Sequence, residues 1–288
     1  MAYLLLALSM TFSTGRNLLS KNLSSVKFGT KSFFLCQGLL FLCGGIAIAL
    51  FGKATFGSVT TITFIFAIIY GLLLILAQWF YTMALAKGNT SLCSTVYSLG
   101  FIFPTLSGAL LWDEAVSPLD LLGILCAASA VIISGRKPQA KENTDKSHYF
   151  VPLVIAMLAS GGLGIVQKLQ QKSAYAEQKS IFLLIAFAIA AGISLLFSLF
   201  AQKQSDTPLR QRKLAIASCV GFFFGCCNLL NTSLAGLLDS AIFFPTLNIG
   251  VILLSMLCAT LFFREKIRKR EIAVLISGVA SILLLNFG

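Results

Sequence analysis

Residues 136–149 read RKPQAKENTDKSHY, and this stretch decides how the rest of the chain is divided. It is the longest run without an apolar cluster, and it lies close to the middle of the 288 residues. Five apolar segments precede it and five follow it. We therefore expect residues 136–149 to be a cytoplasmic linker between two membrane units of one kind, residues 1–135 and residues 150–288.

The composition is typical of a chain that resides in a bilayer. Hydrophobic residues make up 57% of it and charged residues 11%, and its mean hydropathy is +0.90. Soluble domains average roughly 45–50% apolar and 25% charged residues. A backbone inside a bilayer must satisfy its own hydrogen bonds, which favours helices, and strand-like alternation typical of a barrel is absent from the sequence. The composition predicts an all-α membrane protein.

The polar residues give no sign of an enzyme, a metal site or a cofactor site. All eight cysteines lie in or beside apolar segments, where free cysteine behaves as a small buried hydrophobe, and none has a metal-ligand spacing with the single histidine, His148. The sequence contains no nucleophile–base pair and no phosphate loop. We expect no enzymatic activity, no metal and no cofactor. The net charge of +12 comes largely from basic residues in short loops between spans. We interpret these residues as setting the orientation in the membrane rather than as binding nucleic acid.

Ten apolar segments approach the length of about 20 residues that a membrane-spanning helix needs. The expected spans are Ala2–Leu19, Phe33–Phe51, Val59–Met83, Ser91–Trp112, Leu119–Ser134, Phe150–Leu169, Ile181–Ala201, Leu214–Leu238, Ala241–Phe263 and Ile272–Phe287. Alternate loops differ sharply in basic residues: one set holds seventeen of the 22 Lys and Arg residues and the other set holds four. By the positive-inside rule, both termini are expected outside a cytoplasmic (inner) membrane.

The two halves share an order of short sequence matches. LLWDEAVSPLD (110–120) and LFFREKIRKRE (261–271) both place a glutamate, Glu114 or Glu265, just after an apolar segment. Earlier in each half, KSFFL (31–35) corresponds to KSIFL (179–183). Because each unit has an odd number of spans, the second unit must enter the membrane upside down, as in many secondary transporters. We therefore expect two inverted five-helix repeats.

Two longer runs resemble a known family. STVYSLGFIFPTLSGALLWDEAVSPLDLLGI (94–124) and SAIFFPTLNIGVILLSMLCATLFFREKI (240–267) are similar to the fourth-to-fifth and ninth-to-tenth helix regions of EamA-type proteins of the drug/metabolite transporter (DMT) superfamily. This resemblance covers nearly the whole chain as two EamA-like units. It implies ten helices around a central cavity and transport by alternating access without ATP.

Arg16 is the sharpest candidate for contact with a substrate. It lies inside the first expected span, and the expected spans contain no Asp or Glu that could neutralise it except Asp120, at the outer start of the fifth span. A buried charge costs about 2.5–3.5 kcal/mol on insertion scales, so an anionic substrate could act as its counter-ion. The alternative is that its long side chain snorkels to the inner headgroups. Ser9, Ser13 and Asn17 extend the same polar face of this helix.

Further polar residues in the spans could line a cavity or bond to neighbouring helices. The candidates are Gln78, Tyr81, Thr82, Tyr97, Asn228, Asn231 and Asn248. Gln167 and Lys168 are expected to be interfacial anchors at the outer end of their span. Pro104 withholds an amide from the Gly100 carbonyl, so these two residues are the expected hinge, with a purely structural kink as the alternative.

Small residues recur at every fourth position in the fifth and tenth spans, at Gly123 and Ala127 and at Ala273, Ser277 and Ser281. This spacing favours close helix contact between the two halves, with a dimer contact as the alternative.

The function that fits these residues is secondary active transport of a small polar or anionic metabolite. The expected partners are that small-molecule substrate, the lipid bilayer and a coupling ion or counter-substrate, and the expected state is a monomer or weak dimer. A drug or lipophilic-cation exporter is one alternative, although related small multidrug transporters rely on a carboxylate in their first helix, where this chain has Ser13 and Thr14. A non-transporting membrane scaffold with the same fold is the other alternative.

Overall fold

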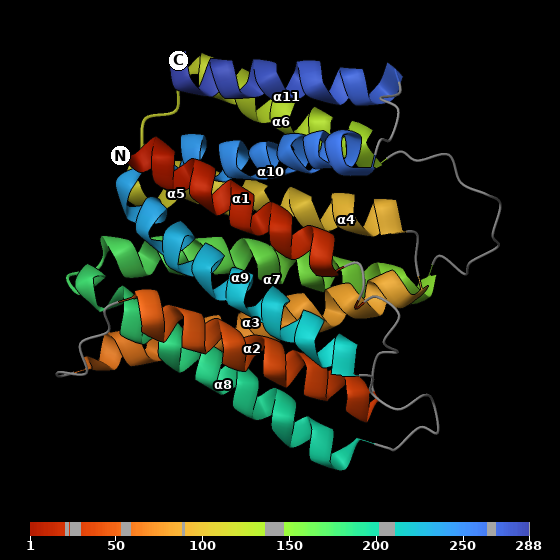
Figure 1. Cartoon of the computed structure of the whole chain (residues 1–288). Helices are drawn as coiled ribbons and strands as arrows, with labels where there is room; N and C mark the ends of the chain where they lie inside the picture. The colour runs from red at the N-terminus through yellow and green to blue at the C-terminus, as the bar shows by residue number, and fades with distance from the viewer. Residues whose placement is uncertain are drawn as a thin grey trace.

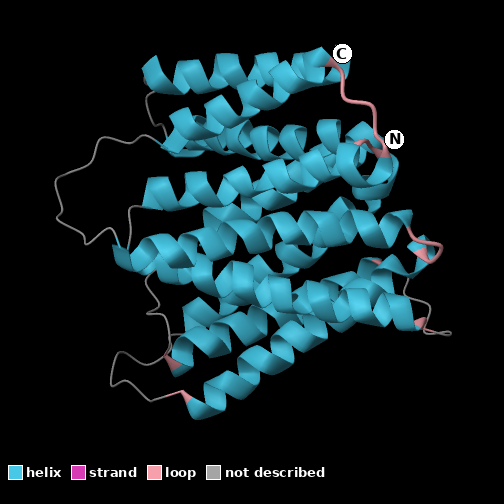
Figure 2. Cartoon of the chain, turned by 180° about the vertical axis from the view of Figure 1, so that it is seen from behind, coloured by secondary structure: helices cyan, strands magenta, loops and turns pink. Residues whose placement is uncertain are grey.

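The computed structural model describes residues 1–20, 23, 30–52, 59–87, 90–135, 147–201, 211–263 and 269–287. Every regular element in these ranges is helical (Figure 2). The helices are α1 (Ala2–Ser20), α2 (Lys31–Phe51), α3 (Thr61–Lys87), α4 (Thr90–Ser98), η2 (Leu99–Phe101), α5 (Ile102–Trp112), α6 (Pro118–Gly135), α7 (Ser147–Lys172), η3 (Ala176–Gln178), α8 (Lys179–Phe200), α9 (Gln211–Leu237), α10 (Ser240–Phe263) and α11 (Lys269–Phe287). Each expected span falls on one of these helices within a few residues, except that α4, η2 and α5 together occupy the range expected as one helix.

Seven helical segments are long and apolar enough to cross a membrane: Lys31–Phe51, Thr61–Leu85, Thr95–Trp112, Phe150–Lys172, Ala176–Phe200, Gln211–Leu237 and Ser240–Cys258. The apolar parts of α6 and α11 are shorter. Large apolar side chains such as Leu110 and Phe200, both 80% exposed, cover the outer surface, while many hydroxyls and amides are buried inside. An apolar exterior around a partly polar interior is the arrangement expected of a multi-pass membrane protein.

Helices from the two halves of the chain are interleaved (Figure 1). Among these contacts, α2 packs against α8 and α9, and α3 packs against α7 and α8. In addition, α1 packs against α9, and α6 packs against α11. The N- and C-termini lie on the same face of the bundle (Figure 1). We call this the terminal face; it also carries the turns at 113–117, 173–178 and 238–239.

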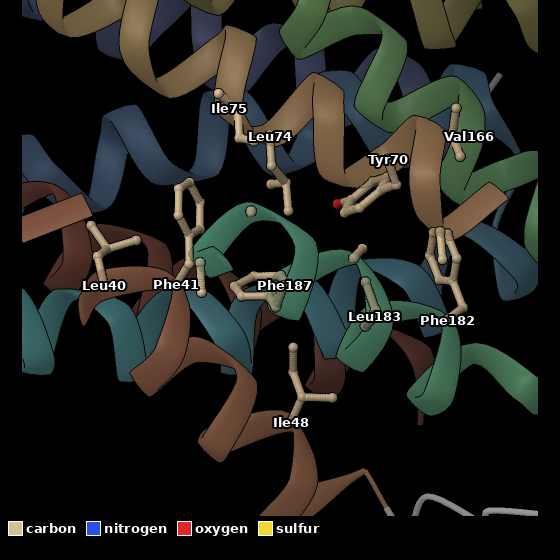
Figure 3. Close-up of a cluster of buried hydrophobic side chains, with 14 of the residues drawn as sticks. Leu40, Phe41, Ile48, Tyr70, Leu74, Ile75, Val166, Phe182, Leu183 and Phe187 are labelled. Carbon is tan, nitrogen blue, oxygen red and sulfur yellow. The ribbon is translucent and has the colours of Figure 1, made fainter. Parts of the chain in front are cut away.

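A large aromatic and aliphatic cluster of buried side chains lies between α2, α3 and α8 (Figure 3). The rings of Phe41 and Phe187 meet edge to face, with centroids 6.1 Å apart, and Tyr70 lies 5.1 Å from Phe182. Inside a bilayer, lipid tails are as apolar as leucine, so helices associate mainly through close packing and polar contacts. Interlocking aromatic rings supply that packing across the two halves.

Glycines allow α2 and α9 to touch backbone to backbone. A Cβ atom on Gly221 would collide with the carbonyl of Leu40, and one on Gly225 would collide with the carbonyl of Gly44. The two α9 glycines are four residues apart, as in membrane helix pairs that cross closely. This contact joins the first half of the chain to the second.

Serine hydroxyls connect α6 and α11. Ser281 donates a hydrogen bond of 2.8 Å to the Gly123 carbonyl, and Ser277 donates one of 2.9 Å to the Cys126 carbonyl. Ser277 and Ser129 are also 2.7 Å apart. The expected close contact between the small-residue faces of these two helices is confirmed, and it joins the two halves.

Candidate functional site

A polar seam runs between α1 and α9. The Ser9 hydroxyl donates a 2.5 Å hydrogen bond to Oδ1 of Asn231, and the Ser13 hydroxyl donates a 3.3 Å bond to the sulfur of Cys227. Ser9 is fully buried and Ser13 nearly so. The structure thus brings three of the expected site residues, Ser9, Ser13 and Asn231, to one helix contact, where they bond to α9 or α1.

Arg16 lies one turn beyond this seam, where α1 is half-buried rather than buried. Its guanidinium stands 4.9 Å from the centre of the Phe224 ring and donates a 3.2 Å hydrogen bond to Oδ1 of the neighbouring Asn17, which is exposed. No carboxylate of the described residues lies within ion-pair distance of it.

A hydrogen-bonded triad lies deeper between α3, α7 and α9. The Tyr70 hydroxyl donates a 2.5 Å bond to Oδ1 of Asn228, and Gln167 donates one of 2.8 Å to the Tyr70 hydroxyl. Asn228 in turn donates to the Phe224 carbonyl at 2.8 Å. All three side chains are buried, so the triad is internally satisfied, as buried polar groups require.

Only Asn228 of this triad is among the residues expected to bind substrate. Tyr70 was missed, and Gln167 was expected at the interface, but it is 5% exposed and points into the triad. A tyrosine in the middle of the apolar run 61–77 was the signal that could have identified Tyr70, because a buried tyrosine hydroxyl usually needs a partner.

The remaining candidates are divided between two surroundings. The rings of Tyr81 in α3 and Tyr97 in α4 pack against each other, with centres 4.4 Å apart. Thr82 and Asn248 bond to carbonyls one turn back in their own helices, at 2.8 Å and 3.0 Å, while Gln78 is half-buried. Tyr81 and Tyr97 therefore form a pair of their own, and in the described part of the chain no hydrogen bond joins Thr82, Gln78 or Asn248 to Arg16.

Helix geometry changes just before Pro104. The segment Leu99–Phe101 is a 3-10 turn between α4 and α5, and the Thr105 hydroxyl bonds to the Phe101 carbonyl at 2.8 Å. A Cβ atom on Gly100 would lie 2.7 Å from the carbonyl of Met157 in α7. A short 3-10 stretch inside a longer helix often marks a bend or hinge. The Gly100–Pro104 segment is thus distorted and tightly packed against the second half.

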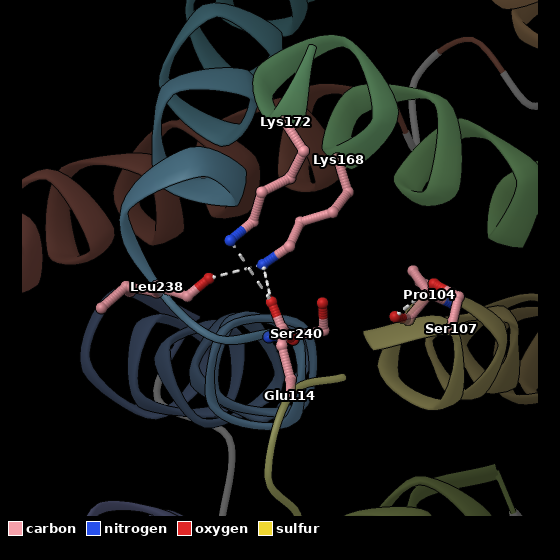
Figure 4. A network of polar contacts seen from close by, with 7 residues as sticks. All are labelled: Pro104, Ser107, Glu114, Lys168, Lys172, Leu238 and Ser240. Atoms are coloured by element: carbon pink, nitrogen blue, oxygen red, sulfur yellow. Dashed lines mark hydrogen bonds and ion pairs between the residues drawn. The ribbon is translucent and has the colours of Figure 1, made fainter. Parts of the chain in front are cut away.

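A buried ion pair occupies the terminal face (Figure 4). Lys168 Nζ lies 2.5 Å from Glu114 Oε1 and donates a 2.9 Å hydrogen bond to the Leu238 carbonyl. The other oxygen of Glu114 accepts a 2.7 Å bond from the Ser240 amide, at the start of α10. The side chains of Lys168 and Glu114 are 1% and 6% exposed.

This pair corrects the expectation that Lys168 is an interfacial anchor. Lys168 lies inside α7 and is among the most buried large side chains of the described residues. Its burial is tolerable because Glu114, just past the end of α5, neutralises it. Burial opposes ionisation of Glu114, but hydrogen bonds from Lys168 and Ser240 outweigh it and hold the pKa of this carboxyl below its ordinary value.

Comparison with known proteins reveals the fold and no more. No model of a protein family matches the chain, and no curated protein sequence matches it. A solved structure described as "Crystal structure of protein" matches with a TM-score of 0.75, covering 99% of this chain and 96% of that chain. The two are 15% identical in sequence, so this likeness concerns the helical architecture alone.

Proposed function

We propose that the protein is a secondary active transporter of the EamA type, built as ten membrane helices in two inverted five-helix repeats, which moves a small polar or anionic metabolite by alternating access. The family proposal draws on the sequence runs 94–124 and 240–267, and the nearly complete overlap with a solved helical structure is compatible with it.

The helix contacts support the repeat. If α1, α2, α3, α4–α5 and α6 correspond in order to α7, α8, α9, α10 and α11, exchanging the halves should leave the contact pattern unchanged. The contact of α2 with α9 then has its counterpart in that of α3 with α8, and the contact of α1 with α9 has its counterpart in that of α3 with α7. The contacts α2–α8, α5–α10 and α6–α11 are their own counterparts. Such exchange symmetry is typical of transporters made from repeats.

An even number of membrane crossings returns the chain to the side where it began, and both termini lie on the terminal face (Figure 1). The excess of basic residues in the loops on the opposite side favours a cytoplasmic location for that side. We therefore assign the terminal face to the outside of the cytoplasmic membrane.

The observation that carries the substrate class is the state of Arg16. Its guanidinium has an aromatic ring and an amide oxygen as neighbours, but no carboxylate among the described residues neutralises it. An arginine fork suits a carboxylate or phosphate, which it can bind through two parallel hydrogen bonds. Tyr81 and Tyr97, whose rings pack against each other between α3 and α4, could contact the rest of the substrate. The same positive charge disfavours a cationic drug at this site.

Thermal stability in the presence of ligands tests this proposal. Purified protein should be screened by intrinsic fluorescence against matched anionic, zwitterionic and cationic metabolites, and we expect an anionic compound to raise the Tm of the wild type but not of Arg16→Ala. Arg212→Ala is the matched control, since it removes an exposed arginine from the start of α9 and should keep the shift. The compound found should then enter or leave liposomes that contain the wild type.

Two outcomes would contradict the proposal. A stabilising compound without negative charge, or one that stabilises Arg16→Ala equally, would exclude the assigned role of Arg16. Ligand binding without movement of the labelled compound in liposomes would favour the non-transporting scaffold.

A further inference from the structure

The Glu114–Lys168 pair joins three separate pieces of the chain at the terminal face. Glu114 belongs to the turn after α5 in the first half, Lys168 to α7 in the second half, and the Leu238 carbonyl and Ser240 amide to the turn between α9 and α10. Lys172 adds a second positive charge 4.0 Å from Glu114. Figure 4 shows both lysines reaching from α7 toward this one carboxylate.

Both carboxylate oxygens of Glu114 have a partner in this network. Glu114 uses one oxygen for Lys168 and the other for the first amide of α10, where the helix dipole also favours a negative charge. Separating α5 from α7 or α10 would break the ion pair and take from Lys168 the carboxylate that makes its burial tolerable. The terminal face can therefore open only when this network is broken or hydrated.

The network is also connected to the interior through one turn of α7. Gln167, the neighbour of Lys168, donates to Tyr70 in the buried triad, and Asn228 of that triad bonds to the carbonyl of Phe224, whose ring lies under Arg16. A change in the position of α7 or α9 at the candidate site would thus displace the partners of Glu114. The distorted Gly100–Pro104 segment precedes Glu114 along the chain and gives α5 a place to bend.

We propose that the Glu114–Lys168 ion pair, with the Ser240 amide and the Leu238 carbonyl, is a latch that holds the terminal face closed and that must open for this face to admit or release substrate. This inference rests on the proposed transport cycle, in which one face closes as the other opens. The latch is a positioning device: Glu114 holds α5, α7 and α10 together and needs no contact with substrate.

Hydrogen–deuterium exchange of the full chain in lipid nanodiscs tests the latch without any substrate. We expect Glu114→Gln to speed amide exchange several-fold at the end of α5 and in the first turns of α10, because the closed state loses its ion pair. In the same sample, exchange at the opposite face, at the end of α3 and the start of α4, should slow. Lys168→Met should act in the same direction.

Asp120→Asn is the matched control. Asp120 is another buried carboxylate nearby, in the first turn of α6, but it accepts its 2.8 Å hydrogen bond from the Ser117 amide and caps α6 locally. Its loss should speed exchange at the start of α6 only.

Each outcome decides the inference. Unchanged exchange in α10 of Glu114→Gln would overturn the latch, and so would faster exchange confined to the terminal face without slower exchange at the opposite face, which indicates a static anchor. A latch response in a protein for which no anionic ligand is found would refute the proposed substrate and leave the latch standing.

Discussion

Arg16 and Lys168 are two basic side chains in membrane helices, and the structure treats them in opposite ways. Lys168 is 1% exposed and has a carboxylate 2.5 Å away, an acceptor carbonyl and a neighbouring helix end. Arg16 is half-buried and rests on an aromatic ring, with an exposed asparagine as its hydrogen-bond partner. Among the described residues, the more buried charge is therefore the one that has a carboxylate partner.

The difference teaches how to distinguish a structural charge from one available to a ligand. A buried cation remains charged in low dielectric only with a partner, and once paired it has little left to offer a ligand. A cation that the chain leaves without a carboxylate keeps both its charge and its donors. Position inside an apolar segment does not distinguish a structural charge from one available to a ligand. The presence of a neighbouring carboxylate does.

The largest expected effect on stability comes from removing the carboxylate partner of Lys168. Glu114→Gln should lower the free energy of unfolding by about 3–5 kcal/mol, because it leaves the Lys168 ammonium buried and uncompensated. Lys168→Met should also destabilise, and the double variant should recover much of the loss because no unpaired charge remains. Denaturation of the three variants in one detergent gives the coupling energy. Additive losses in the double variant would mean that the two side chains do not stabilise each other.

The sequence reveals the helices more fully than it reveals this pair. Apolar runs determine helix positions to within a few residues, and the small residues Gly123, Ser277 and Ser281 correctly predict the contact of α6 with α11. In both cases a local pattern carries the information. Spacing also held a signal that was passed over, since Gly221 and Gly225 allow the close contact of α9 with α2.

The partners of charged and polar residues could not be predicted in the same way. Glu114 and Lys168 come from different halves of the chain, as do Tyr70 and Asn228, so their meeting depends on how the two halves interleave. Counting basic residues by loop also treated Lys168 as exposed, because a residue near a helix end looks the same whether it faces headgroups or a neighbouring helix. The seam of Ser9 with Asn231 shows the same limit: the residues were identified, but not their pairing.

A smaller effect is expected from pH, and it sharpens the assignment of Glu114. The pKa of Glu114 is lowered in the folded protein, so its carboxylate stabilises the fold above the unfolded-state pKa of about 4.3, and this contribution is lost as the pH falls through the lower, folded-state pKa. Burial opposes ionisation and offsets part of the gain from Lys168, which is why the pH effect should be smaller than that of removing the carboxylate.

The measurement is the difference in Tm between the wild type and Glu114→Gln from pH 7 to pH 3. It should stay constant down to about pH 5 and shrink below about pH 4, because Glu114 of the unfolded wild type takes up a proton there while the folded carboxylate does so only at lower pH. If the Tm difference grew as the pH fell, the pKa of Glu114 would be raised rather than lowered. The Glu114–Lys168 ion pair would then not stabilise the fold.

The smallest expected effect on stability comes from removing the charge of Arg16, which has no carboxylate partner among the described residues. Arg16→Met keeps much of the apolar stem and removes the charge, so its loss of stability should be about 0.5–1 kcal/mol, the value of an exposed cation–π contact such as that with Phe224. Lys168→Met is the matched substitution and should cost several times more. Unfolding of both variants in the same detergent measures the contrast directly. If Arg16→Met destabilised the protein as strongly as Lys168→Met, Arg16 would be a structural charge that the fold depends on, and its guanidinium would not be free to meet an anion.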